Sequence, residues 1–520
     1  MTSNEPPDSS TPPVGRAAFR GSFWMLFNAV ATRLTGLMAT VLLGLWLTQA
    51  DFGVFGIAMS VSALAAVLRE GGLRQYLVRE HRRHEQLIGP VFYMALCFNL
   101  LTAGLMVGMA QFSSLWTEDA AQAHSIALLV YVAAISAPLG TPGAVLQARP
   151  MGGLQFGTIS AITGFSSLIR YGGMILLAWR FADTLGTLTL VLTLPVCAVF
   201  EWVAFRYVNP ERLWSRRPEV STWPSLLSHA RWILLGSLAI AMINWAPNLA
   251  LSAVSRDTDL VGVYFMAFNI VAQVGILLSA NVGAVLLPAF AKLTGDRGRL
   301  DSAILKSIRQ MMLLATPLSL GLAVTFPALE QLIWHGKWES AAAAVRVLGY
   351  MYPFLVMLAV PLAAQQAVGQ FRQWALTLLA VGGVSIASAA AGGVMVPHGA
   401  RAVEGIAWWT GLSGAAVALT CTVLIAGRLG IAVGATVASA LPAWAIALAA
   451  AIPAIWLDGR VFANLGSIVR FMASGGLFSV LFVACVRILV PGHIEEALAM
   501  VPSSAGRFCR RALLLPEPVS

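Results

Sequence analysis

Charged residues are scarce in this chain of 520 residues, because Asp, Glu, Lys and Arg together make up only 11% of it. Soluble domains carry about 25% charged residues, since a folded soluble protein must cover its surface with polar groups. Hydrophobic residues reach 58%, which is more than a soluble core can hide. The sequence therefore excludes a soluble enzyme, a nucleic-acid-binding protein and a disordered scaffold, and it predicts a polytopic membrane protein.

The sequence motifs of common enzymes are missing as well. There is no HExxH zinc motif, no nucleophile elbow, no phosphate-binding P-loop and no CxxC pair. The five cysteines have no spacing typical of disulfides or metal sites. The chain is therefore predicted not to be an enzyme, and no cofactor is expected, with coupling to H⁺ or Na⁺ left open.

Long apolar runs separated by short polar segments dominate the rest of the chain. A helix that crosses a bilayer needs about 20 mostly apolar residues, and fourteen runs qualify. The predicted helices are 23–47, 52–69, 88–110, 122–143, 157–179, 184–206, 231–253, 259–288, 311–328, 340–364, 373–395, 404–427, 435–456 and 467–489.

The basic residues between these runs are strongly asymmetric. With the N-terminus inside, 24 Lys and Arg residues fall on the cytoplasmic side and five on the outer side. Short cytoplasmic loops of membrane proteins carry this excess, which explains the net charge of +10 better than binding to nucleic acid does. We therefore predict a multi-pass protein of the bacterial cytoplasmic (inner) membrane with both termini in the cytoplasm.

Six predicted segments follow from this pattern and from an internal repeat. Gly53–Ala58 and Gly262–Ala267 open equivalent helices with the same orientation, as expected for two parallel lobes. The segments are a disordered cytoplasmic N-terminus (1–20), an N-lobe of helices 1–6 (21–206), a cytoplasmic interfacial linker (207–230), a C-lobe of helices 7–12 (231–427), helices 13–14 (428–490) and a cytoplasmic tail (491–520).

Two cytoplasmic segments are amphipathic. Glu219–Arg231 and Leu300–Arg309 place apolar residues on one side and basic or polar residues on the other. Such segments can lie along an anionic leaflet, or they can be the cytoplasmic ends of the membrane helices that follow them.

Several motifs resemble those of one transporter family in both order and spacing. They are Trp46–Phe55, Gly71–Leu73, Leu146–Phe156, Gly262–Tyr264, Val285–Ala289, Pro317–Leu322, Trp334–Trp338 and Gln366–Gln370. Together they resemble the bacterial polysaccharide transporters, the lipid-linked oligosaccharide flippases of the multidrug/oligosaccharidyl-lipid/polysaccharide exporter superfamily. The turn Ala148–Gly153 departs from the family pattern.

The resemblance implies a fold and a function. The fold is an all-α polytopic membrane protein of about 14 transmembrane helices, with two pseudo-symmetric six-helix lobes plus two C-terminal helices. The function is alternating-access movement of a polyprenyl-(pyro)phosphate-linked oligosaccharide from the cytoplasmic to the periplasmic leaflet, for exopolysaccharide, capsule or O-antigen synthesis. Membrane lipids, a polysaccharide polymerase and export machinery are the expected partners.

Two other functions remain open. One is a multidrug or small-molecule cation antiporter of the same superfamily, which would need a membrane-embedded carboxylate. The other is a membrane-embedded polymerase or ligase that acts on the same lipid-linked sugar. A flippase leaves the glycan length unchanged, whereas a polymerase extends it.

Two arginines predicted at mid-membrane depth are candidates for phosphate binding. Arg33 lies about halfway along helix 1 and Arg170 about halfway along helix 5, where ionisable residues are costly and mark function. Arginine binds phosphate through paired charge-assisted hydrogen bonds. The alternative is that each guanidinium extends to the interface or bonds to helix carbonyls.

Neutral amides and one carboxylate are the remaining candidates. Amides offer both donors and acceptors to sugar hydroxyls, but they can also form hydrogen bonds between helices. The candidate sugar-binding residues are Asn28, Asn244, Asn248, Asn269, Gln273 and Asn281. Pro247 should kink its helix. Glu201 is a candidate for ion coupling, with a local ion pair to Arg206 as the alternative.

Overall fold

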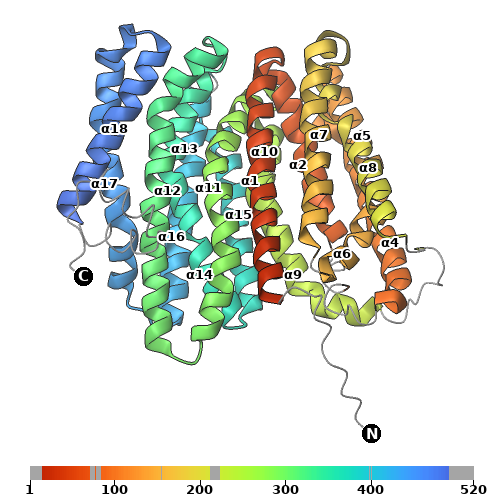
Figure 1. Cartoon of the computed structure of the whole chain (residues 1–520). Helices are drawn as coiled ribbons and strands as arrows, with labels where there is room; N and C mark the ends of the chain where they lie inside the picture. Colours follow the sequence, from red (N-terminus) through yellow and green to blue (C-terminus); the bar gives the residue numbers. More distant parts are fainter. Residues whose placement is uncertain are drawn as a thin grey trace. The chain divides into compact units, whose positions relative to one another are not determined.

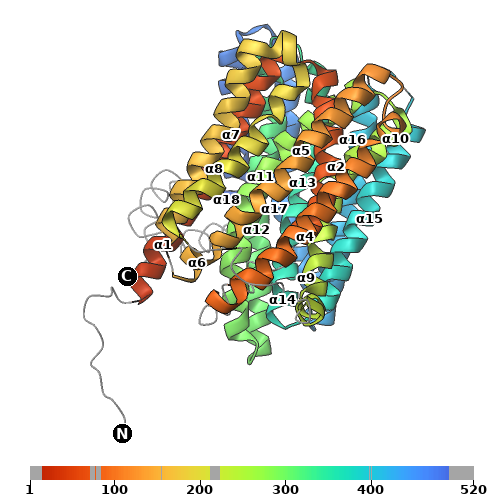
Figure 2. The same cartoon turned by 90° about the vertical axis from the view of Figure 1, so that its right-hand side faces the viewer.

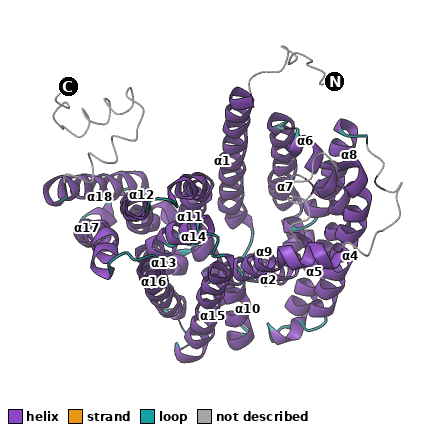
Figure 3. Ribbon diagram, turned by 90° about the horizontal axis from the view of Figure 1, so that it is seen from below, coloured by secondary structure: helices purple, strands orange, loops and turns teal. Residues whose placement is uncertain are grey.

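Every element that the structure describes is helical. It is a computed structural model that describes residues 14–70, 77, 84–153, 155–210, 213, 223–397, 399 and 401–490. The side chains of 14–23, 25–26, 68–70, 84–86, 224–231, 233 and 279–284, Asn281 among them, lie outside that description. Figure 3 shows α-helices and short 3-10 turns, with no strand in the described part.

The chain divides into two compact units, Met1–Ala241 and Met242–Ser520, which we call unit 1 and unit 2. Unit 1 contains α1 (Val14–Trp46), α2 (Gln49–Glu70), α4 (His84–Ala110), η2 (Ser113–Leu115), α5 (Ala120–Leu146), α6 (Ala148–Gly152), α7 (Phe156–Leu185), η3 (Gly186–Leu190) and α8 (Thr193–Val208). The boundary between the units falls within α9 (Trp223–Asn244).

Unit 2 contains the remaining helices, drawn from green to blue in Figure 1. They are α10 (Ala246–Ser255), α11 (Thr258–Leu293), α12 (Arg297–Trp334), α13 (Glu339–Met357), α14 (Ala359–Ala367), α15 (Phe371–Met395), α16 (Ala402–Arg428), α17 (Val433–Arg460), η5 (Phe462–Asn464) and α18 (Ser467–Leu489).

The described helices confirm a multi-pass membrane protein with about the expected number of spans. Twelve helices are long and apolar enough to cross a bilayer, or 13 when the bent pair α9 and α10 counts as one span. The sixth predicted helix, 184–206, does not count as a full span and corresponds to η3 and α8. With 16 residues, α8 is shorter than the roughly 20 residues that a full span requires.

Three helix starts differ from the sequence-based expectations. α1 begins at Val14, so residues 14–20 of the predicted disordered segment are helical, whereas residues 1–13 lie outside the described part. α9 begins at Trp223 and continues through Arg231, and α12 runs unbroken from Arg297 to Trp334. Ile304 and Ile308 in α12 are fully buried, so 300–309 is a packed extension of a membrane helix rather than an interfacial one.

Aspartates begin three of the helices. Asp119, Asp257 and Asp296 each accept a backbone N–H from the first turn of α5, α11 and α12, respectively. The first turn of a helix has N–H groups without partners inside the helix, and Asp satisfies one of them. Two of these residues, Asp119 and Asp257, are acids of short predicted outer connections, and their place in the fold is that of helix caps.

The core of each unit follows from helix packing. In unit 1, α5 packs against α2, α4 and α8, and α7 packs against α1 and α8. Figure 2 shows α7 and α8 side by side. In unit 2, α13 packs between α11, α12 and α16, whereas the C-terminal pair α17 and α18 packs on α12. The C-terminal helices are therefore an integral part of unit 2.

Candidate functional site

A polar seam joins α1 to α7 in unit 1. The Asn28 side-chain amide donates to Thr163 Oγ1 at 2.9 Å, and the Thr32 hydroxyl donates to Ser167 Oγ at 3.2 Å; both pairs are 135 residues apart. Gly36 lies against the ring of Tyr171 at the same spacing. A constant spacing at three successive contacts, over about two turns, means that the two helices run parallel and in fixed register.

This register places the two candidate phosphate-binding arginines at nearly the same depth. With an offset of 135 residues, Arg170 is level with Thr35, which is two residues beyond Arg33. Two helical residues correspond to about 3 Å along the axis. Sequence reasoning alone expects both arginines near mid-membrane, and the seam explains how they come onto neighbouring helices at one level.

Neither arginine is neutralised by the described part of unit 1. Arg33 is exposed and forms no hydrogen bond or ion pair there. Arg170 is partly buried, and its Nε is buried with no hydrogen-bond acceptor. The guanidinium carbon of Arg170 lies 5.5 Å from the centre of the Tyr171 ring. Among the described residues, neither guanidinium donates a hydrogen bond to a helix carbonyl, which was the alternative to phosphate binding.

Glu201 forms no ion pair with Arg206, and it shares the neighbour Cys197 with Arg170. The Cys197 thiol on α8 donates to the Ser166 carbonyl on α7 at 3.4 Å, and both Arg170 and Glu201 act electrostatically on Cys197. Glu201 forms no ion pair with any described residue. A carboxylate and a guanidinium therefore approach one point between α7 and α8 without bonding to each other.

In unit 2, the predicted kink at Pro247 is present as a break between two helices. α9 ends at Asn244, Trp245 has non-helical backbone angles, and Pro247 stands in the first turn of α10. The two helices are bent by 47°. Asn248 is buried at this break, with its side-chain oxygen lacking a hydrogen-bond donor. Asn244, the last residue of α9, takes part in a hydrogen-bonding or electrostatic interaction.

The two described amides of α11 bond within their own helix. Asn269 Nδ2 donates to the Phe265 carbonyl at 2.9 Å, and Gln273 Nε2 donates to the Asn269 carbonyl at 3.2 Å. These amides therefore do not link helices, and their side-chain oxygens accept no hydrogen bond from described residues. The side chain of Asn281 lies outside the described part.

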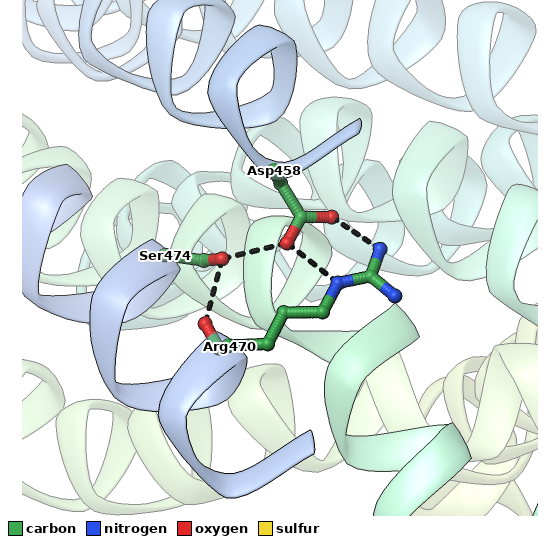
Figure 4. Close-up of polar contacts among 3 residues, drawn as sticks. All are labelled: Asp458, Arg470 and Ser474. Atoms are coloured by element: carbon green, nitrogen blue, oxygen red, sulfur yellow. Dashed lines mark hydrogen bonds and ion pairs between the residues drawn. The ribbon is translucent and has the colours of Figure 1, made fainter. Parts of the chain in front are cut away.

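Sequence reasoning missed a polar cluster between α17 and α18 (Figure 4). Arg470 donates through Nε and Nη2 to both carboxylate oxygens of Asp458, at 2.8 and 2.6 Å. The Ser474 hydroxyl donates to Asp458 Oδ1 at 2.7 Å. Because predicted helix 13 ends at residue 456, Asp458 falls into a loop there, whereas α17 continues to Arg460. The sequence pattern that could have revealed this cluster is Asp458 just after the apolar run 435–456 and Arg470 just inside the run 467–489.

A second acid missed by sequence reasoning shapes the turn between α12 and α13. Glu330 is 2% exposed, and its carboxylate accepts the Trp338 backbone N–H at 2.9 Å. The predicted helix stops at residue 328, so the burial of Glu330 was not expected. This bond fixes the Trp334–Trp338 motif as a tight turn. Among the described residues, no group of three or more His, Cys, Asp or Glu side chains could hold a metal ion.

Comparisons with known proteins identify the family. Residues 42–343 match the family described as polysaccharide biosynthesis protein, and the chain belongs to this family. The teichuronic acid biosynthesis protein TuaB of Bacillus subtilis (strain 168) is 21% identical over 341 residues, covering 65% of this chain and 68% of that protein. An uncharacterized membrane protein in the cps region of Klebsiella pneumoniae is 19% identical over 327 residues, covering 62% and 66% of the two chains.

Solved structures share the fold. The lipid II flippase MurJ in an inward closed conformation has a TM-score of 0.69 at 11% identity, covering 91% of this chain and 100% of that chain. An inward-facing multidrug resistance MATE family transporter of the MOP superfamily has a TM-score of 0.58 at 15% identity, covering 77% and 99%. The chain is therefore a membrane protein of this family, and it shares its fold with solved flippase and multidrug-transporter structures.

Proposed function

We propose that the chain moves a polyprenyl-(pyro)phosphate-linked oligosaccharide from the cytoplasmic to the periplasmic leaflet of the inner membrane by alternating access. The two unneutralised arginines at one level of the parallel pair α1 and α7 carry this proposal. Two positive charges at one level of neighbouring helices are costly unless an anion lies near them. The charge of a lipid-linked sugar is its phosphate, which guanidinium groups bind through two parallel hydrogen bonds.

In this proposal the two units have different roles. Arg33 and Arg170 of unit 1 would bind the phosphate. Asn28, which the sequence suggests as a sugar ligand, would instead position α1 on α7, because its amide donates to Thr163. The amide oxygens of Asn248, Asn269 and Gln273 in unit 2 would accept hydrogen bonds from sugar hydroxyls, since described residues leave them unoccupied. Asn244 and Asn281 belong to the same proposed set. A polysaccharide polymerase and export machinery would use the product.

The proposed coupling site is Glu201. It is partly buried on α8, forms no ion pair with a described residue, and acts on the same thiol, Cys197, as Arg170 does. Binding of the phosphate by Arg170 would change the electrostatic field at Glu201, and this change would link the substrate to a proton or Na⁺. The same carboxylate is what a multidrug cation antiporter would need, so transport of an organic cation without lipid-linked sugar would favour that alternative.

Translocation in proteoliposomes tests the phosphate site. A polyprenyl-pyrophosphate disaccharide is scored by the accessibility of its sugar to an impermeant oxidant. Loss of charge-assisted hydrogen bonds worth about 1.5–3 kcal/mol corresponds to a loss of roughly tenfold or more. We therefore expect Arg33→Ala to lower the rate by at least about tenfold, and Arg33→Lys to restore only part of it because lysine lacks the planar fork.

The matched control is Arg180→Ala, which removes an exposed arginine near the C-terminal end of α7. This variant should retain the full translocation rate. Arg33→Ala should lower the translocation rate of a substrate with a truncated glycan as much as that of the disaccharide substrate. The double variant Asn269→Ala with Gln273→Ala should lower the rate for the longer glycan more than for the truncated one. Full translocation by a correctly inserted Arg33→Ala protein would refute the proposed phosphate site.

A further inference from the structure

Two arginines from different helices of unit 2 act on one aspartate. Asp458 on α17 is almost fully buried, and its side chain is 5% exposed. Its two oxygens are already occupied by α18, because Arg470 binds both of them and Ser474 binds one. Arg346 on α13 is close enough to act electrostatically on the same carboxylate.

Arg346 faces α17 but has no bonded partner. Tyr350, one turn further along α13, accepts a hydrogen bond at its carbonyl from Trp444 Nε1 of α17 at 2.8 Å. Residues four apart share a helix face, so Arg346 is on the side of α13 that is turned toward α17. Its Nε is buried without an acceptor, and Arg346 forms no hydrogen bond or ion pair within the described part of the chain.

The cluster therefore carries a surplus positive charge. Two guanidiniums, which stay protonated in proteins, face one carboxylate whose oxygens are taken. A buried N–H group without an acceptor is costly, and a guanidinium fork matches a phosphate group in shape and charge. Beside Arg470, the α18 side chains Ile468, Val469 and Met472 are large, apolar and exposed, as expected for a surface that contacts lipid tails.

We propose that Arg346 binds the phosphate of a membrane lipid, and that the Asp458–Arg470–Ser474 cluster holds α17 and α18 in place as the wall of this site. The ligand would insert its phosphate between α13 and α17 while its tails lie on α18. The lipid is either a phospholipid or a polyprenyl phosphate. The proposal does not depend on the translocation function, since it concerns binding by residues of unit 2, whereas Arg33 and Arg170 belong to unit 1.

Lipid-dependent stabilisation of the full-length protein in detergent tests this site. The midpoint of thermal unfolding is followed while phosphatidylglycerol, polyprenyl phosphate, diacylglycerol or inorganic phosphate is added. For the unmodified protein we expect a rise with at least one of the two phosphate lipids and none with diacylglycerol. In Arg346→Gln, about tenfold more of that lipid should be needed for the same rise, and Arg346→Lys should be intermediate.

Arg401→Gln is the matched control, because Arg401 is an exposed arginine of the same unit at the start of α16, and it should respond like the unmodified protein. A rise only with phosphatidylglycerol identifies a phospholipid, and a rise only with polyprenyl phosphate identifies the lipid carrier. An equal response of the unmodified and Arg346→Gln proteins would overturn the proposal. So would a rise with diacylglycerol as large as with the phosphate lipids, or with inorganic phosphate alone.

Discussion

At the scale of single residues, the buried charge of Asp458 is compensated by the arrangement of the hydrogen-bond donors around it. The Asp458 carboxylate receives a two-point contact from Arg470 and a third hydrogen bond from Ser474. Burying such a pair is expensive, but removing one member leaves the other charge uncompensated, which is worse. The pair therefore fixes the way in which α17 and α18 meet.

We expect Asp458→Asn to destabilise the protein by about 3–5 kcal/mol, because Arg470 loses its counter-charge while partly buried. The midpoint of thermal or denaturant unfolding of the purified protein measures this loss. The double change Asp458→Leu with Arg470→Met should recover much of it, since an apolar pair of similar volume needs no counter-charge. If Asp458→Asn unfolds at the same midpoint as the unmodified protein, the pair contributes no stability.

At the scale of helices, small residues decide how closely two helices approach. A Cβ added at Gly349 of α13 would come within 2.9 Å of both Ala323 Cβ and the Ser319 carbonyl oxygen of α12. Backbone cannot move aside as a flexible side chain can. The adjoining turn has a similar need for glycine, because Gly336 has a φ of 93°, a conformation that side chains disfavour.

Gly349→Ala should therefore force α12 and α13 apart, at a cost of about 1–3 kcal/mol for overpacking. The matched control is Gly383→Ala on α15, where an added Cβ would meet nothing within 4 Å. Alanine favours a helix over glycine by about 1 kcal/mol, so the control should be neutral or stabilising. Thermal unfolding of both variants in one detergent decides the point, and equal midpoints would contradict the close approach.

At the scale of the whole molecule, the orientation in the membrane is still a prediction from charge. The excess of basic residues places position 297, the first residue of α12, in the cytoplasm and positions 118 and 337 outside. Single cysteines introduced at these positions into a chain without its five cysteines should follow that pattern with an impermeant thiol reagent in intact cells. Labelling of position 297 but not of 118 and 337 would mean that the chain has the opposite orientation in the membrane.

The candidate site was predictable only in part. An arginine within a long apolar run is visible in any hydropathy reading, so Arg33 and Arg170 could be chosen from the sequence. Their common level depends on the 135-residue register between α1 and α7, set by Asn28–Thr163 and Thr32–Ser167. No local pattern encodes a pairing between residues so far apart.

The sequence by itself determined the membrane environment, the places of the helices and the family motifs. Burial of apolar runs in lipid and the hydrogen-bond demand of the backbone leave a helix as the solution for each such run. The tertiary structure decided which polar side chains within those helices have partners. Asn269 and Gln273 bond within their own helix, Asp458 bonds to Arg470, and Arg346 bonds to no described residue. The reason is physical: hydrophobicity acts residue by residue along the chain, whereas a hydrogen bond or ion pair requires two groups within about 3 Å, and packing alone brings them there.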